Sequence, residues 1–196
     1  MKKTWIVLIV IGVVVLFLYF GIKGMYNSMV IQNESANAQW SQVESQYQRR
    51  YDLIPNLVAT VKGYATHEQG TLTAVIEARA KATSITIDPS KATAQQMQQF
   101  QQAQGEISST LSKLMVVVEQ YPDLKANKNF LELQAQIEGT ENRIATERQR
   151  FNEAVQAYNA YIKKFPNNIF AGMFGFSARE YFKSEVGAEK APKVQF

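Results

Sequence analysis

An uninterrupted apolar run lies near the N-terminus of the chain. Its 18 residues carry no charged side chain, beginning at Trp5 and ending at Ile22. As a helix the run would be roughly 27 Å long, close to the thickness of the hydrocarbon core of a bilayer. A cleaved signal peptide has a shorter apolar region with a small-residue cleavage site directly after it, whereas the A-x-A sequence at residues 36–38 lies well beyond the run. The pattern predicts a retained transmembrane helix, with the lipid bilayer as its partner.

Beyond Gly24 the apolar residues recur at intervals of three and four, which is typical of helices. No long stretch alternates between apolar and polar residues, as a half-buried strand would. The fold class is therefore predicted to be all-α. We call each series of residues at this helical spacing a stripe. The first stripe continues directly from the apolar run and predicts a helix that extends away from the membrane. It consists of Tyr26, Met29, Val30, Asn33, Asn37, Trp40, Val43, Tyr47, Tyr51 and Ile54.

Pro55 interrupts this first stripe. Proline lacks a backbone N–H and its ring crowds the carbonyl of Tyr51, so it must kink or end the helix. A turn at this point would expose Leu53, Ile54 and Leu57, and the segment lacks the cluster of glycine, asparagine and serine that a tight turn favours. We therefore expect a kink, with a turn at Pro55 as the alternative.

Capping patterns and a proline divide the rest of the chain. Residues 66–69 have the Thr-x-x-Gln pattern of a capping box and predict a second helix that ends near Ala82, while residues 93–96 open a third. Asn129 is the expected N-cap of a fourth helix, and Pro166 ends it. The stripe of the third helix consists of Met97, Phe100, Gln104, Ile107, Leu111, Leu114, Val118 and Tyr121. The stripe of the fourth consists of Phe130, Leu133, Ile137, Ile144, Phe151, Val155, Tyr158, Ile162 and Phe165.

Helices that each carry one apolar stripe must bury it against one another. The sequence thus predicts an N-terminal transmembrane helix followed by an elongated antiparallel four-helix bundle, with a coiled-coil-like seam along the third helix. We divide the chain into an anchor at residues 1–24, the bundle at residues 25–166 and an aromatic-rich C-terminal tail at residues 167–196. The tail is expected to pack on the bundle or on the membrane interface, or to receive a partner. Its candidate contact residues are Phe170, Met173, Phe174 and Phe176.

Charge and composition narrow the classes of partner. The formal net charge is +4, but Lys2, Lys3 and Lys23 flank the anchor, which leaves 18 basic against 17 acidic residues in the rest of the chain. Without a concentrated basic stripe on the bundle, we expect no nucleic-acid partner. The chain has no cysteine, which excludes disulfides, a thiol nucleophile and zinc–thiolate sites.

The sequence contains no pattern typical of a catalytic or cofactor site. His67 is the single histidine, and position 71 is threonine, so the second histidine of a zinc-protease helix is absent. No glycine-rich nucleotide-binding pattern occurs, and we expect no metal, cofactor or small-molecule substrate. Glu138 and Glu141 share one helical face and are expected to be solvated. Arg50, of the pair Arg49-Arg50, is expected to pair with Asp52 or with a neighbouring helix.

The segment from Arg49 to Val58, RRYDLIPNLV, resembles the LemA family. The resemblance covers essentially the whole chain. Its other matching segments are Tyr26-Asn27, Val61-Lys62-Gly63-Tyr64, His67-Glu68, Arg79, Tyr121-Pro122-Asp123-Leu124-Lys125, Glu141-Asn142-Arg143-Ile144, Tyr158-Asn159, Phe165-Pro166 and the C-terminal Pro192-Lys193-Val194-Gln195-Phe196. The resemblance implies a bacterial single-pass membrane protein whose remaining chain is an antiparallel helical bundle. It implies no enzymatic activity or ligand.

These observations favour a non-catalytic module that holds an unknown protein partner, or copies of itself, at the inner membrane. The alternatives are a lipid-sensing or membrane-stress protein that uses the tail, and a hydrolase or metal enzyme that uses His67 and Glu68. The candidate partner surface consists of Arg50, Asp52, Pro55, Asn56, Lys62, His67, Glu68 and Arg79. The same motif can instead be structural, with Arg50, Asp52 and Asn56 bonding groups that the bend at Pro55 exposes.

The flanks of the apolar run predict its orientation. Lys2 and Lys3 precede the run, whereas only Lys23 follows it before Arg49. Lysine and arginine are retained on the cytoplasmic side. The larger number of lysines before the run therefore favours a cytoplasmic N-terminus and an extracytoplasmic bundle.

Overall fold

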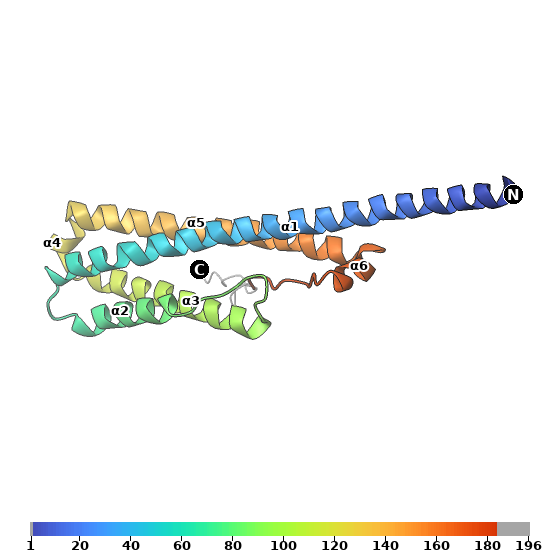
Figure 1. Ribbon diagram of the computed structural model, residues 1–196. Coiled ribbons are helices and arrows are strands. Elements are labelled where there is room, and N and C mark those ends of the chain that lie inside the picture. Colours follow the sequence, from blue (N-terminus) through green and yellow to red (C-terminus); the bar gives the residue numbers. More distant parts are fainter. Residues whose placement is uncertain (1, 184–196) are drawn as a thin grey trace, which may run out of the picture.

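The computed structural model describes residues 2–183, and all of their regular secondary structure is helical (Figure 1). This confirms the all-α fold class. The helices are α1 (Lys2–Lys62), α2 (Gln69–Thr83), α3 (Ala94–Val118), α4 (Pro122–Lys125), α5 (Lys128–Lys163) and α6 (Asn167–Met173). The four longer helices run lengthwise beside one another, and the N-terminal part of α1 projects far beyond them.

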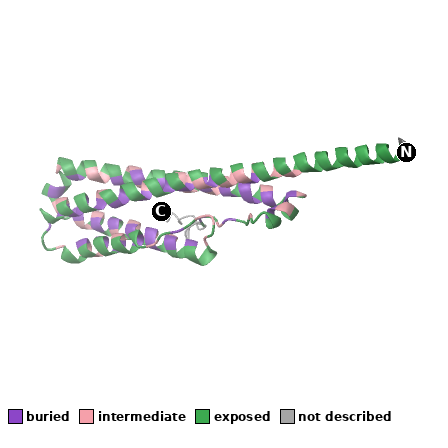
Figure 2. Ribbon diagram, viewed as in Figure 1, coloured by how far each residue is buried: buried purple, intermediate pink, exposed green. Residues whose placement is uncertain are grey.

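Helix α1 joins the apolar run to the bundle without a break. The large apolar side chains from Trp5 to Phe20 are 51–79% exposed, and Figure 2 shows this part of α1 as exposed throughout. Among the described residues, α1 is the one helix long and apolar enough to cross a membrane. It passes through Pro55 and ends at Lys62, so the expected continuation past the proline is confirmed and the alternative of a turn is wrong.

The helices pack in an antiparallel order. Helix α1 packs against α5 along much of its length and against α2 near its C-terminal end, and α2 packs against α3. The short helix α4 lies at the end of the bundle remote from the N-terminus, and α6 lies at the other end (Figure 1). One continuous core runs from Ala36 to the far end, and a smaller cluster around Met29 lies beside α6.

The predicted stripes identify most of the core. Every predicted position of the third helix from Met97 to Val118 is buried, as are most of those in α5. Leu133 is half-buried, and the side chain of Phe165 is 81% exposed. Phe165 is exposed because α5 ends at Lys163, two residues earlier, so the helical spacing no longer applies to this residue.

The predicted helix starts are correct at α3 and wrong at α2 and α5. Thr93 and Gln96 form the expected capping box. Helix α2 instead begins at Gln69, because the chain needs residues 63–68 to turn back from α1 and buries Ala65 in doing so. Helix α5 begins at Lys128, because the side chain of Asn127, rather than that of Asn129, accepts the N–H of Phe130.

The tail after α6 returns along the bundle as an extended segment. The side chain of Asn159 in α5 donates to the backbone carbonyl of Arg179 and accepts from its N–H. The side chain of Asn152 forms the same two hydrogen bonds with the backbone of Phe182. Seven residues of α-helix rise about 10.5 Å, and three extended residues span about 10 Å. The two asparagines are therefore spaced to hold an antiparallel extended segment against the helix.

Phe182 of this segment is part of the core. Its side chain is 5% exposed and its ring stacks on Trp40 with the centroids 5.6 Å apart. Phe151 meets the same ring edge-on at 5.4 Å, and Phe100 lies 6.4 Å away. The tail thus supplies an aromatic side chain to the core, next to rings from α1, α3 and α5.

Candidate functional site

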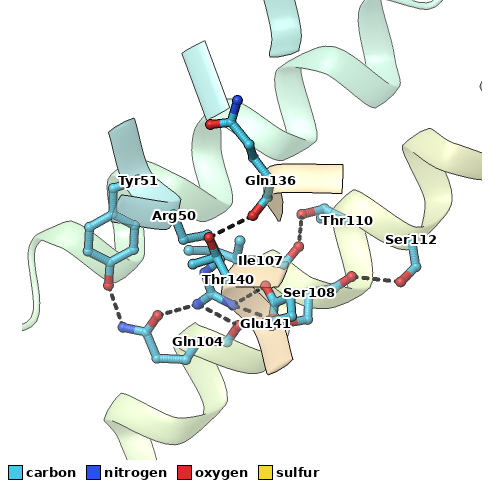
Figure 3. Close-up of polar contacts among 10 residues, drawn as sticks. All are labelled: Arg50, Tyr51, Gln104, Ile107, Ser108, Thr110, Ser112, Gln136, Thr140 and Glu141. Atoms are coloured by element: carbon cyan, nitrogen blue, oxygen red, sulfur yellow. Dashed lines mark hydrogen bonds and ion pairs between the residues drawn. The ribbon is translucent and has the colours of Figure 1, made fainter. Parts of the chain in front are cut away.

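A buried arginine lies at the centre of the most extensive polar cluster in the described part of the chain. Arg50 projects from α1 and is 1% exposed. Its guanidinium donates to Glu141 Oε1 of α5 at 2.6 Å and to Ser108 Oγ of α3 at 3.1 Å. It also donates to the backbone carbonyl and side-chain oxygen of Gln104. Figure 3 shows these groups converging from three helices.

The cluster extends to two tyrosines of α1. Gln104 Nε2 donates to the Tyr51 hydroxyl, and the guanidinium of Arg50 lies 5.3 Å from the centre of the Tyr47 ring. Burial raises the pKa of Tyr47 to about 12 and also raises the pKa of Tyr51, against the opposing effect of its hydrogen bond with Gln104. Both hydroxyls therefore stay protonated at neutral pH.

Arg50 pairs with a neighbouring helix, one of the two arrangements expected from the sequence, whereas Asp52 accepts a hydrogen bond from Gln48. The expectation that Glu141 is solvated is wrong, because it bridges Arg50 and Ser108 with its side chain 32% exposed. The burial of Arg50 favours the structural interpretation of this residue over contact with a partner.

Arg79 compensates for Pro55. Because proline has no N–H, the carbonyl of Tyr51 loses its regular helical donor four residues later. Arg79 Nε of α2 donates to this carbonyl at 2.8 Å. The expectation that a backbone group freed by Pro55 is satisfied by a polar side chain is confirmed, but that side chain is Arg79 rather than Arg50, Asp52 or Asn56.

Asp52 and Asn56 are exposed on a groove of about 880 Å³ between α1 and the connection from α2 to α3. Glu44 and Arg49 add charge to its rim, and Ile85 is among the apolar residues that line it. The groove thus combines apolar walls with both signs of charge.

The candidates near the end of α1 lie apart from this groove. Lys62 ends α1 and is exposed, as is His67 in the turn to α2. Glu68 accepts a hydrogen bond from the Tyr121 hydroxyl at 2.8 Å, which ties this turn to the end of α3. The described residues contain no group of three or more metal-ligating side chains.

The four tail candidates lie beside the end of the apolar span. Phe174 and Phe176 meet Tyr26 of α1 edge-on, with centroids 5.1 and 5.8 Å apart. Phe170 packs with Met25 against the small cluster around Met29, whereas Met173 is 73% exposed.

Sequence reasoning did not identify Arg179 as a structural residue. It is 3% exposed, donates to the side-chain oxygens of Asn33 and Asn37, and lies 5.5 Å from the centre of the Tyr158 ring. Burial lowers the pKa of its guanidinium. The sequence did contain a signal for such a residue. Asn33 and Asn37 lie within the first stripe of α1, where polar side chains need a hydrogen-bond partner.

Comparison with known proteins identifies a matching family and several relatives. The model of the LemA family matches residues 39–196. Magnetosome protein MamQ 2 of Paramagnetospirillum magneticum is 29% identical, and magnetosome protein MamQ of Magnetospirillum gryphiswaldense is 28% identical. Each of these alignments covers 84% of this chain and 66% of the relative, so the chain spans just under two thirds of their length. Protein LemA of Metamycoplasma hominis is 28% identical over 87% of this chain and 74% of its own.

None of these names denotes an enzyme. The exposed apolar span of α1 and the family match support a membrane-associated helical protein.

Proposed function

This chain belongs to the LemA family, and we propose that it is a non-catalytic, single-pass module that holds a protein partner, or further copies of itself, at the bacterial inner membrane. The observation that carries this proposal is the continuity of α1. Its exposed apolar part passes directly into residues that pack against α5 and α2. From Gly24 to Lys62 the helix rises about 57 Å. A partner bound to the bundle is thereby held at a fixed height above the bilayer.

The groove that contains Asp52 and Asn56 is the proposed docking surface. It is large enough for a peptide segment, its apolar walls can bury side chains, and its charged rim can select a partner. Both Asp52 and Asn56 are exposed, so a bound chain can reach them.

Photo-crosslinking in cells tests this docking role. A photoreactive amino acid at Asn56 should give a discrete crosslinked species, either with another protein or with a second copy. The same amino acid at Lys113, an exposed residue of α3 outside the groove, is the control. The absence of any product at Asn56, together with a monomeric full-length protein in mild detergent, would contradict the proposal.

A second candidate function is contact between α6 and the bilayer. Ile169 and Met173 of α6 are 54% and 73% exposed, and α6 packs near Met25 and Met29, within about 10 Å of the end of the apolar span along α1. Exposed apolar side chains at this height favour insertion into the interface. A fragment of residues 25–196 should float with liposomes, and Met173→Glu should weaken its binding. Equal flotation of both fragments, or none, would argue against this role.

We propose the orientation with the N-terminus in the cytoplasm from the lysines that flank the span. Because the chain has no cysteine, Ser177→Cys places a single thiol at an exposed position of the tail. A membrane-impermeant maleimide should label it in intact cells. Labelling only after lysis would place the bundle in the cytoplasm and reverse the orientation.

A further inference from the structure

Three exposed lysines lie at the α6 end of the bundle. Lys163 ends α5 and Lys164 follows it, while Lys23 of α1 lies just beyond the apolar run. Ile162, directly before the first two lysines, belongs to the same small cluster as Met29 of α1. All three lysines are therefore at one end of the molecule, beside α6 (Figure 1).

The described part of the chain offers these lysines no acidic partner. Along α1 the first acidic residue after the apolar run is Glu34, about 18 Å beyond Ile22. Along α5 the last one is Glu153, about 15 Å before the end of the helix, and α6 contains no charged residue. None of the three lysines forms an ion pair with a described residue. At the α4 end, by contrast, Lys125 and Lys128 each pair with a glutamate.

Large apolar side chains are exposed beside the same lysines. Phe165 directly follows Lys164 and is 81% exposed. Ile169 and Met173, which are also exposed, are four residues apart in α6 and so share one face of this helix. An exposed apolar surface bordered by lysines is typical of proteins that lie against the surface of an anionic bilayer.

The height of this end matches that of the lipid head groups, provided that the apolar run spans the bilayer as proposed above. Met25 and Met29, which pack beside α6, lie about 4.5 and 10.5 Å beyond Ile22 along α1. The head-group layer extends about 5–7 Å from the hydrocarbon core on each side. Long lysine stems lie along apolar surface and extend the reach of the ammonium group. The ammonium groups of Lys163 and Lys164 can therefore meet lipid phosphates.

We infer that the α6 end of the bundle binds anionic phospholipids, with Lys163 and Lys164 at their head groups and Phe165 at the boundary with their acyl chains. Zwitterionic lipids carry no net charge, so they gain the apolar contact without the attraction to the lysines. The inference adds a choice of lipid class to the proposed contact between α6 and the bilayer, on which it rests. It holds for either orientation of the span, because it concerns the leaflet that faces α6.

Fluorescence quenching by lipids of two classes tests the inference. Asn168→Cys places a fluorophore at an exposed position of α6 in the full-length protein, reconstituted in phosphatidylcholine. A trace of phosphatidylglycerol with a quencher on its acyl chain should quench at least about twofold more strongly than the same amount of phosphatidylcholine with this quencher, and added salt should reduce the ratio. Equal quenching by the two lipids would overturn the inference and leave the bilayer contact of α6 intact. No quenching by either lipid would contradict both.

Two double variants assign the lipid preference to particular lysines. Lys163→Gln with Lys164→Gln should lower the quenching ratio toward one. Lys125→Gln with Lys128→Gln removes the same charge from exposed positions at the α4 end and should leave the ratio unchanged. Phe165→Ser should weaken the quenching by both lipids without changing their ratio. A ratio that persists without Lys163 and Lys164, or that falls equally in both double variants, would contradict the inference.

Discussion

Arg50 connects three helices through one side chain. An unpaired charge would be very costly at a site 1% exposed, and Glu141 together with the polar groups of Gln104 and Ser108 compensates for it. This explains why Gln104 lies within the buried stripe of α3, where an apolar residue would otherwise be expected.

Replacement of Arg50 should therefore destabilise the bundle. Arg50→Met removes the hydrogen bonds to α3 and α5, and we expect the free energy of unfolding to fall by about 2–3 kcal/mol. Glu141 is partly exposed and can be hydrated, which keeps the loss below that of a fully buried stranded charge. Denaturant unfolding measures the change. Arg49→Met, at the exposed neighbouring position, should change it by less than about 0.5 kcal/mol; equal losses for both would refute this account.

The contact between Arg79 and the Tyr51 carbonyl predicts a coupling with Pro55. Arg79→Met should cost about 1–2 kcal/mol, because it leaves the carbonyl without its side-chain donor. In a Pro55→Ala background the alanine N–H supplies the regular helical bond, so the same change should cost about 0.5 kcal/mol or less. A double-mutant cycle measures the difference. If the two costs agree, Arg79 does not compensate for the proline.

The contact between Arg79 and the Tyr51 carbonyl shows which part of the site can be predicted from single residues. The chemistry of proline alone predicts that the Tyr51 carbonyl needs a donor. Arg79 is 28 positions away along the sequence and reaches the carbonyl only because α2 folds back along α1. Such a partner depends on tertiary packing, which local spacing does not specify.

At the scale of elements, the tail behaves as part of the core. Phe182→Ala removes a ring that contacts Trp40 and Phe151, and comparable core truncations cost about 3–5 kcal/mol. We expect a loss near the lower end of this range, because the ring is contributed by a segment that lies outside the helices. Trypsin should then cleave at Arg179, which is buried in the intact fold.

Tyr181→Ala is the matched control for this prediction. Tyr181 is adjacent and 37% exposed, and its replacement should cost less than about 1 kcal/mol and leave Arg179 protected. If Phe182→Ala leaves both the stability and the cleavage at Arg179 unchanged, the tail does not close the core.

The elements were predictable to different degrees. The helices of the bundle follow from stripes of apolar residues at helical spacing, since burial of these stripes is the main source of their stability. The starts of α2 and α5 differ from the predictions because Ala65 and Asn127 satisfy tertiary and backbone requirements that compete with the local capping pattern. The return of the tail depends on Asn152 and Asn159, whose spacing has meaning only once an extended partner lies against them.

At the scale of the whole molecule, the continuity of α1 sets the geometry. The exposed apolar run and the first helix of the bundle are one element, so the α6 end of the bundle lies next to this run and the α4 end is remote from it (Figure 1). From Ile22 to Lys62 the helix rises about 60 Å. With the apolar run spanning the bilayer as proposed, α6 lies close to the bilayer, and the groove beside residues 40–56 of α1 and the Arg50 cluster lie together further from it.

Fluorescence quenching by lipids with labelled head groups tests this upright arrangement most directly. Two single-cysteine variants of the reconstituted full-length protein, Asn168→Cys in α6 and Lys125→Cys in α4, each place a fluorophore at an exposed position. The account predicts strong quenching at position 168 and none above background at position 125. Comparable quenching at both positions would show that the bundle lies along the membrane, and would contradict a module held upright by α1.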